Sequence, residues 1–174
     1  MDSQTELESH HGVLMNVETY GVLIIGAPAI GKSSLALELL SQGYQLIADD
    51  VVDFYSANNI IIGQCPSMLT GLLHTRELGL ISVAMVFGDK ACRSYSKVDY
   101  IIELTHQIDS PLNLVLEKKN YVILNTAFPL LTLSVTSPAS LSTRLLCWLK
   151  MQATSNPVKN KLQQGENPLM SFAK

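Results

Sequence analysis

The sequence predicts an α/β fold, a P-loop domain in which a mixed β-sheet is packed with helices, and three observations support this prediction. The apolar run 21–25 is followed by the segment 26–33, Gly-Ala-Pro-Ala-Ile-Gly-Lys-Ser, which matches the phosphate-binding pattern G-x-x-x-x-G-K-[ST] in full. Apolar residues recur at helical spacing directly after this segment. Several short apolar runs of strand length follow later in the chain.

The elements around this loop follow in chain order. Residues 12–17 and 20–25 are predicted to form the two strands of a hairpin, joined by two polar residues. A helix is predicted over 32–42, and Gly43 is suited to the position just after its end. Residues 44–48 then form a short apolar strand.

Later elements are assigned from the same patterns. Further strands are predicted at 60–64, 80–86, 100–104, 121–124 and 130–135. An amphipathic helix is predicted over 140–152, because its leucines and Trp148 recur on one stripe. Apolar periodicity then disappears, so residues 1–154 are predicted to be one domain and residues 155–174 a surface segment or loose tail.

Composition bounds the class of protein. The chain has 174 residues, 47% of them hydrophobic, enough for one aliphatic core. Its net charge of −3 argues against a nucleic-acid partner held by a broad basic surface. Its 3 cysteines form no C-x-x-C pair, so neither a disulfide framework nor a zinc site is indicated. No signal-peptide pattern and no long apolar run is present, so we expect a cytoplasmic protein without a membrane partner.

Each residue type of the loop has a chemical reason. Gly26 and Gly31 let backbone N–H groups point at an anion, the Lys32 ammonium reaches the β- and γ-phosphates, and the Ser33 hydroxyl ligates Mg²⁺. The residues predicted to hold the phosphates of ATP are Gly26, Ala27, Pro28, Ala29, Ile30, Gly31, Lys32, Ser33 and Ser34. Lys32 is also the only Lys or Arg among the first 75 residues. The alternative is a glycine-containing turn that binds nothing.

Asp49 and Asp50 stand at the end of the predicted strand 44–48, with Asp53 shortly after them. Ligands bind at the carboxyl ends of parallel strands, so these carboxylates are expected near the phosphate loop. Phosphoryl transfer needs a carboxylate that holds the metal and a group that accepts the hydroxyl proton, and two adjacent aspartates can divide these roles. The alternative is a solvated aspartate turn.

Several segments resemble the catalytic core of HPr kinase/phosphorylase. The strongest are 31–40, Gly-Lys-Ser-Ser-Leu-Ala-Leu-Glu-Leu-Leu, and 43–53, Gly-Tyr-Gln-Leu-Ile-Ala-Asp-Asp-Val-Val-Asp. His-Gly-Val-Leu at 11–14, Leu-His-Thr-Arg-Glu-Leu-Gly-Leu-Ile at 73–81 and Val-Phe-Gly at 86–88 are similar to further family elements. The chain is similar to a short form of the family that consists of the catalytic C-terminal domain alone.

The resemblance implies an activity and roles for residues. The family uses ATP and Mg²⁺ to phosphorylate a serine of the phosphocarrier HPr, many members reverse the reaction with inorganic phosphate, and a ring-like homohexamer is expected. Asp49 would act as the base toward serine and as the acid in reverse, with Lys32 beside the phosphates. His11 would sit beside Asp49 and tune it. Ser33 and Asp50 would hold Mg²⁺.

Two residues depart from the family pattern. His74 stands where the family usually has a metal-linked glutamate, and Mg²⁺ prefers oxygen donors to a neutral imidazole. Either Glu77, which replaces a family glycine and lies one turn away if the segment is helical, supplies the missing carboxylate, or metal binding is weaker in this protein. We find no copy of the arginine-bearing loop that the family places between its late strands.

The basic residues Arg76, Lys90, Arg93 and Lys97 either line a substrate-facing rim or form an ordinary solvated surface. Arg93 is the one for which we expect contact with phosphate or partner. The leading hypothesis is an ATP-dependent serine kinase for HPr or an HPr-like protein. A P-loop kinase for a small molecule and a nucleotide-sensing regulator with decayed catalysis are the alternatives.

Overall fold

The computed structural model describes residues 6–107 and 119–154. These residues belong to two compact units, the first containing 6–107 and 119–137 and the second containing 138–154. All the strands described below lie in the first unit. The prediction of a surface tail at 155–174 lies outside the described residues.

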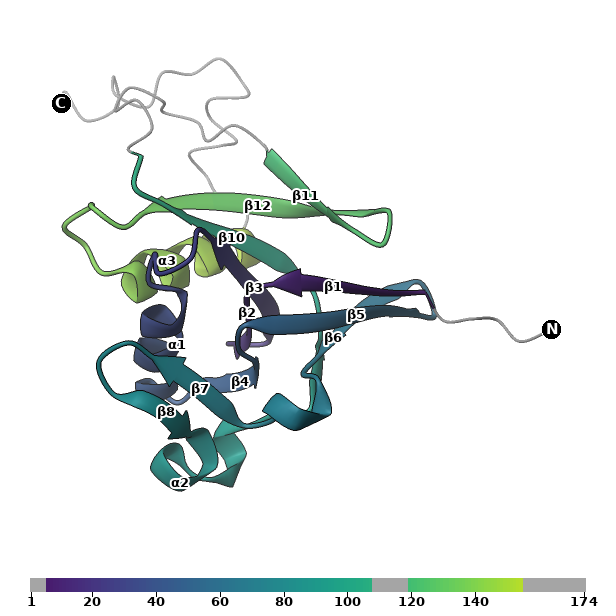
Figure 1. The fold of residues 1–174 in the computed structure, drawn as a ribbon. Coiled ribbons are helices and arrows are strands. Elements are labelled where there is room, and N and C mark those ends of the chain that lie inside the picture. Colours follow the sequence, from purple (N-terminus) through teal and green to yellow (C-terminus); the bar gives the residue numbers. More distant parts are fainter. Residues whose placement is uncertain (1–5, 108–118, 155–174) are drawn as a thin grey trace, which may run out of the picture. The chain divides into compact units, whose positions relative to one another are not determined.

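The larger sheet of the first unit is mixed, as predicted. Six strands among the described residues form it in the order β11-β12-β10-β3-β2-β4 (Figure 1). Their bounds are β2 (Val13–Val17), β3 (Tyr20–Gly26), β4 (Gln45–Ala48), β10 (Tyr100–Thr105), β11 (Lys119–Ile123) and β12 (Thr126–Ser134). β3, β10 and β12 are parallel, and β2 pairs antiparallel with both β3 and β4. The carboxyl ends of β3 and β4 therefore lie at the same edge of the sheet.

A second sheet is antiparallel and has the order β1-β5-β6-β9. Its strands are β1 (Leu7–His11), β5 (Val51–Ala57), β6 (Ile60–Gln64) and β9 (Tyr95–Lys97). β7 (Leu72–Thr75) and β8 (Gly79–Ser82) form a separate hairpin. Side chains of both larger sheets share one buried cluster, which includes Leu14, Leu23, Phe54 and Ile101. β4 and β5 are consecutive in the chain and lie in different sheets, and Asp49 and Asp50 connect them.

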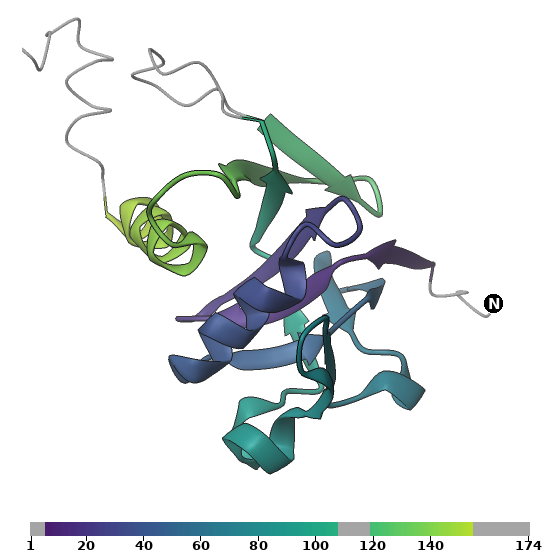
Figure 2. The ribbon, with the colours of Figure 1, turned by 60° about the vertical axis from the view of Figure 1, so that its left-hand side comes forward.

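Helix α1 (Lys32–Ser41) begins where the sequence predicts and ends one residue before the predicted end at 42. It packs against β2, β3 and β4 (Figure 2), and its apolar side chains on that face are buried. The N–H of Tyr44 donates to the carbonyl of Leu39 and that of Gly43 to Leu40, with Gly43 at φ +91°. This pair of hydrogen bonds is the Schellman arrangement, in which glycine adopts the left-handed conformation at lowest cost.

The second unit contains helix α3 (Leu141–Ala153), close to the predicted 140–152. Ser140 caps it, since its hydroxyl accepts a hydrogen bond of 3.2 Å from the N–H of Thr143. Leu145 and Leu149 are buried. Over the described residues, no helix combines the length and the apolar character that crossing a bilayer would require.

The predicted strand at 80–86 is wrong in its second half. β8 ends at Ser82, and α2 (Val83–Phe87) follows and stops at Gly88, whose φ is +90°. The segment has the β-branched and aromatic composition of a strand, but Met85 is 88% exposed and Val86 61% exposed, so no sheet face buries them. The strand-like composition of this segment does not produce a strand, because the segment has no partner strand among the described residues.

Four strands were not predicted, and two others begin before their predicted ranges. β1, β5, β7 and β9 are polar or only half-buried along much of their length, so they lack a continuous apolar run. β11 and β12 begin before the predicted 121–124 and 130–135. Leu124 and Asn125 join them with φ of +46° and +59°, the conformation of a tight hairpin turn.

Candidate functional site

The phosphate loop is shaped by residues at positive φ. Gly26 ends β3 at φ +146°, Ala29 has φ +62° and Gly31 precedes α1 at φ +115°. A Cβ placed on Gly26 would lie 2.8 Å from the carbonyl oxygen of Leu104, so only glycine fits there without displacing β10. Ile30 is buried and anchors the loop, while the residues between Gly26 and Ile30 are exposed.

The start of α1 is available to an anion. The capping residue is Gly31, which has no side chain that could cap the first turn, and the first turn contains no acidic residue. The first N–H groups of a helix have no partner within the helix and carry the positive end of its dipole. The loop therefore presents backbone donors and partial positive charge to solvent, the chemistry that binds phosphate.

Lys32 lies across the loop that precedes it. Its Nζ donates to the carbonyl oxygens of Gly26 at 2.9 Å and Ala27 at 3.1 Å. An ammonium has three N–H donors, so these two bonds leave one for a ligand. The lysine is held over the loop by the same backbone that shapes the anion site.

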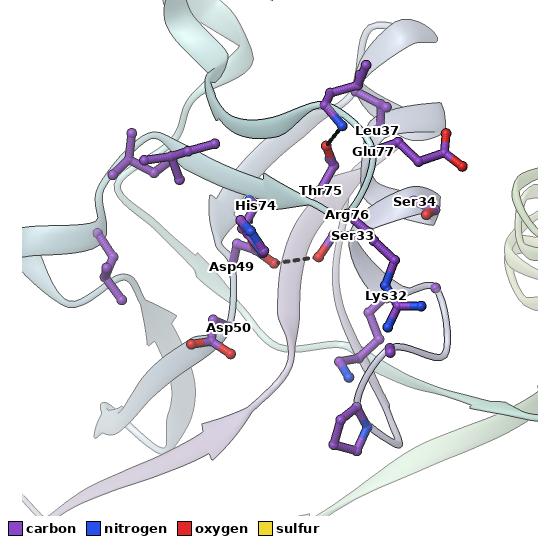
Figure 3. Close-up of a pocket in the computed structure, with 17 residues that line it drawn as sticks. Lys32, Ser33, Ser34, Leu37, Asp49, Asp50, His74, Thr75, Arg76 and Glu77 are labelled. Carbon is purple, nitrogen blue, oxygen red and sulfur yellow. Dashed lines mark hydrogen bonds between the residues drawn. The ribbon is translucent and has the colours of Figure 1, made fainter.

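Asp49 joins the loop to the rest of the pocket. It follows β4 and is only 7% exposed. Its Oδ1 accepts a hydrogen bond of 3.1 Å from the Ser33 hydroxyl (dashed in Figure 3), and its Oδ2 accepts one of 2.8 Å from the N–H of His74. Burial raises the pKa of the Asp49 carboxyl above its usual value, and the hydrogen bonds only partly oppose that rise.

The next residue, Asp50, is exposed and has φ +70°. Nδ1 of His11 lies 3.2 Å from the backbone oxygen of Asp50 and 3.7 Å from its Oδ1. The expectation that His11 sits beside Asp49 is therefore corrected, because the ring lies against Asp50. Both side chains are largely exposed, so their attraction is weak in the isolated chain.

These groups line one cavity of about 880 Å³. The lining residues are Pro28, Ala29, Gly31, Lys32, Ser33, Ser34, Leu37, Asp49, Asp50, Leu69, Leu72, His74, Thr75, Arg76, Glu77, Leu78 and Leu80. Every residue of the predicted loop lines it except Gly26, Ala27 and Ile30, and His11 is also outside the lining. The phosphate loop, the β4 carboxylates and the β7–β8 hairpin thus form one site.

Glu77 lines this cavity, but it does not lie on a helix one turn after His74, as its proposed role as the replacement carboxylate requires. Residues 76–78 form the turn between β7 and β8, so the segment is not helical. In Figure 3 the carboxylate of Glu77 points away from Asp49 and Asp50. Within residues 6–107 and 119–154, no group of three or more His, Cys, Asp or Glu side chains is arranged to hold a metal.

The residues present nevertheless suit a magnesium nucleotide. The Ser33 hydroxyl and the Asp50 carboxylate both line the cavity, and both are the oxygen donors that Mg²⁺ prefers. Mg²⁺ keeps several waters and is bound through one or two carboxylates together with phosphate oxygens, so a dedicated cage of side chains is not needed. The loop donors and Lys32 supply the complementary positive charge.

Arg76 is a site residue that the sequence reasoning left as one of four surface candidates. It lines the cavity, and Lys90, Lys97 and the favoured Arg93 do not. The signal available in the sequence was its place inside the family-like segment 73–81, between the two departures from the pattern, His74 and Glu77. Spacing among the basic residues alone could not separate it from the others.

Comparisons with known proteins identify the family to which the chain is similar. Residues 2–159 match the family model described as HPr Serine kinase C-terminal domain. The HPr kinase/phosphorylase of Azoarcus sp. (strain BH72) is 37% identical over 141 residues, which cover 79% of this chain and 45% of that protein. The HPr kinase/phosphorylase of Nitrosomonas europaea is 39% identical over 122 residues, 67% of this chain and 38% of that protein.

A solved structure is also similar. The Hpr(Ser) kinase/phosphatase from Coxiella burnetii matches with a TM-score of 0.77 and 28% sequence identity, over 90% of this chain and 97% of that chain. The chain spans less than half the length of the two curated relatives described above. The predicted fold is therefore confirmed by a relative of known structure.

Proposed function

Since the chain belongs to the family of HPr serine kinase C-terminal domains, we propose that it transfers the γ-phosphoryl group of ATP to a serine of HPr or an HPr-like carrier protein. The bond between the γ-phosphorus and the bridging oxygen of ATP breaks, and a bond between phosphorus and the serine oxygen forms. The serine proton passes to Asp49, and ADP leaves. In phosphorolysis, an oxygen of inorganic phosphate bonds to the phosphorus of the phosphoserine, and the bond between that phosphorus and the serine oxygen breaks. Pyrophosphate leaves, and Asp49 returns the proton to the serine oxygen.

The observation that carries this proposal is the hydrogen bond between Ser33 and Asp49 in a cavity that also contains Lys32. It joins the loop that binds phosphates to a carboxyl group that can take up a proton. Phosphoryl transfer depends mainly on positioning and on stabilising the charge of the transferred group. A turn with a purely structural role would not require Lys32, Ser33 and Asp49 to lie in one cavity.

Asp49 suits the role of proton acceptor in two respects. Burial raises the pKa of its carboxyl, which strengthens it as a base. The hydrogen bond that Asp49 accepts from the Ser33 hydroxyl is 3.1 Å long, and the one that it accepts from the backbone N–H of His74 is shorter, at 2.8 Å. Rotation of the Ser33 hydroxyl would free Oδ1 for the acceptor serine while Oδ2 stays fixed.

The remaining roles follow from position. Ser33 and Asp50 would hold Mg²⁺, and His11 would orient Asp50. Glu77 lines the same cavity, but its carboxylate points away from Asp49 and Asp50. Bound Mg²⁺ would supply neutralisation of charge on the phosphate oxygens. The backbone of the phosphate loop and Lys32 would bind the β- and γ-phosphates. We also propose a cytoplasmic location and a homohexameric assembly, both from the family resemblance.

One observation favours a second candidate, a nucleotide-sensing protein with decayed catalysis. His74 lines the cavity, and its backbone N–H is bonded to Asp49. Its imidazole occupies a position where the family usually has a carboxylate. A missing metal ligand would weaken catalysis more than phosphate binding, because the loop and Lys32 do not depend on it.

A paired experiment tests the proposal against this candidate. ATP binding is measured by calorimetry with Mg²⁺, and phosphoryl transfer to HPr is measured with radiolabelled ATP, for the wild type and His74→Glu. The kinase proposal predicts transfer by the wild type. Binding without transfer in the wild type, together with transfer by His74→Glu, would favour the sensor. Absence of ATP binding would contradict both.

A further inference from the structure

We propose that Arg76 is a second phosphate-binding cation of the cavity and contacts oxygens of the transferred phosphoryl group. This inference deepens the proposed function and rests on it, since it requires that the cavity binds phosphates. It assigns a role to the turn between β7 and β8, which the phosphate-loop pattern does not cover.

The chemistry calls for more positive charge than Lys32 supplies. The transferred phosphoryl group spreads negative charge over three equatorial oxygens, and fixed donors aimed at them are a major source of catalysis. Two of the three donors of Lys32 are bonded to Gly26 and Ala27. Lys32 therefore has one donor left for a phosphate that already accepts from the loop.

Arg76 is the cation that can supply the remainder. Among the residues that the structure describes, Lys32 and Arg76 are the Lys and Arg side chains that line the cavity. In Figure 3 the guanidinium of Arg76 lies on the side of the cavity where Lys32 is found. A guanidinium offers five donors in a planar fork that matches two phosphate oxygens at once.

Arg76 also forms no hydrogen bond or ion pair with any residue in the described ranges. The carboxylates of Asp49, Asp50 and Glu77 line the same cavity, yet none of them pairs with the guanidinium. Lys97, by contrast, is engaged with Asp99 at 2.8 Å. The Arg76 guanidinium is thus available to an anion that enters the cavity.

The backbone that carries Arg76 is fixed on both sides. Thr75 is buried, and its Oγ1 accepts a hydrogen bond of 3.1 Å from Leu78 N–H and donates one of 3.3 Å to Gly79 O. Gly79 has φ +75°, which permits the tight return into β8. His74 N–H is bonded to Asp49, so the turn is tied to the carboxyl group that also holds Ser33.

The test is calorimetric binding of pyrophosphate and of ATP, with kcat and KM for transfer measured in parallel. The variants are Arg76→Ala, Arg76→Gln and Arg76→Lys, with Lys90→Ala as a charge-matched control outside the cavity and Lys32→Ala as the phosphate-loop control. Thermal unfolding verifies that each variant is folded. Arg76→Gln keeps most of the side chain in case Arg76→Ala disturbs the turn.

We expect Arg76→Ala and Arg76→Gln to weaken pyrophosphate binding about 10-fold or more and to lower kcat more than they raise KM for ATP. Arg76→Lys should recover part of the loss, because it keeps the charge but not the fork. Lys90→Ala should bind as the wild type does. A purely structural turn residue would change unfolding without this division between kcat and KM.

Two outcomes would overturn the inference, and they differ in what they say about the proposed function. If folded Arg76 variants bind pyrophosphate and turn over like the wild type while Lys32→Ala does not, Arg76 has no such role and the proposed function stands. If the wild type binds neither pyrophosphate nor ATP, both the inference and the proposed function fail.

Discussion

The hydroxyl of Ser33 donates a hydrogen bond of 3.1 Å to Oδ1 of Asp49. Ser33 lies in the first turn of α1, where the phosphate loop ends, and Asp49 follows β4, so the bond joins the start of the helix to the end of that strand. Because Oδ2 of Asp49 accepts from His74, the hairpin β7–β8 is attached to the same carboxyl group. The site thus depends on one buried side chain that contacts three elements.

Ser33→Ala tests this connection through stability. The change leaves Oδ1 of buried Asp49 without its hydroxyl partner, so we expect the free energy of unfolding to fall by about 1–2 kcal/mol. Denaturant unfolding measures it, with Ser34→Ala as the matched control, because Ser34 is exposed and has no hydrogen bond to Asp49. Equal stability of the two variants would contradict the structural role of the bond.

The pH dependence of stability tests the environment of Asp49. Burial raises the pKa of this carboxyl in the folded state. Its contribution to stability is therefore fully present below the unfolded value near 3.8 and is lost as pH rises through the folded pKa. Relative to Asp49→Asn, the wild type should lose stability as pH rises over this window. Denaturant unfolding of both proteins at several pH values measures the difference, and an opposite slope would contradict the assignment.

Glu8 should show the reverse pH dependence. Its Oε2 accepts a hydrogen bond of 2.6 Å from Leu124 N–H, and this bond is the main cause of a pKa below 4.5. The stabilisation is present above 4.5 and lost as pH falls through the folded pKa. Glu8→Gln should cost about 1 kcal/mol at neutral pH, a modest figure because the carboxylate is partly exposed, and less in acid.

The control for Glu8 is Glu6→Gln, which removes a charge from an exposed residue two positions earlier. It should leave the free energy of unfolding unchanged at both pH values. If Glu8→Gln and Glu6→Gln behave alike in denaturant unfolding at neutral pH, the bond between Glu8 and the β11–β12 turn contributes nothing measurable.

Two glycine substitutions separate steric from conformational constraint in the phosphate loop. Alanine at Gly26 brings its Cβ to 2.8 Å from Leu104 O and requires φ +146°, whereas alanine at Gly31 meets no atom within 4 Å and is constrained by φ +115° alone. We expect Gly26→Ala to destabilise more, with backbone strain of about 1–3 kcal/mol common to both. Thermal unfolding ranks them, and greater stability of Gly26→Ala would contradict this reading of the loop.

Local sequence was sufficient for the part of the site built from contiguous chain. The loop pattern, α1 and its end at Gly43 all depend on residues close together in sequence. The prediction that Asp49 lies near the phosphate loop followed from the direction of β4. The short apolar run at 44–48 indicated that strand. These features need only backbone conformational preferences and the geometry of a parallel sheet.

Features set by distant contacts were not predictable in the same way. His11 lies against Asp50 rather than Asp49 because β1 pairs with β5 in a register that sets His11 opposite Val51. The spacing of the basic residues alone did not separate Arg76 from the other three, and it is the β7–β8 turn that places Arg76 at the cavity. α2 replaced a predicted strand because its exposed Met85 and Val86 have no sheet partner in the described part of the chain.

The most direct test of the central claim is intact-mass measurement of HPr from the same cell after incubation with this protein and Mg-ATP. If the chain is an HPr serine kinase, HPr gains one phosphate on a serine, and Lys32→Ala and Asp49→Asn abolish the gain while Asp49→Asn still binds ATP. HPr of unchanged mass, with wild-type protein that is folded and binds ATP, would contradict it.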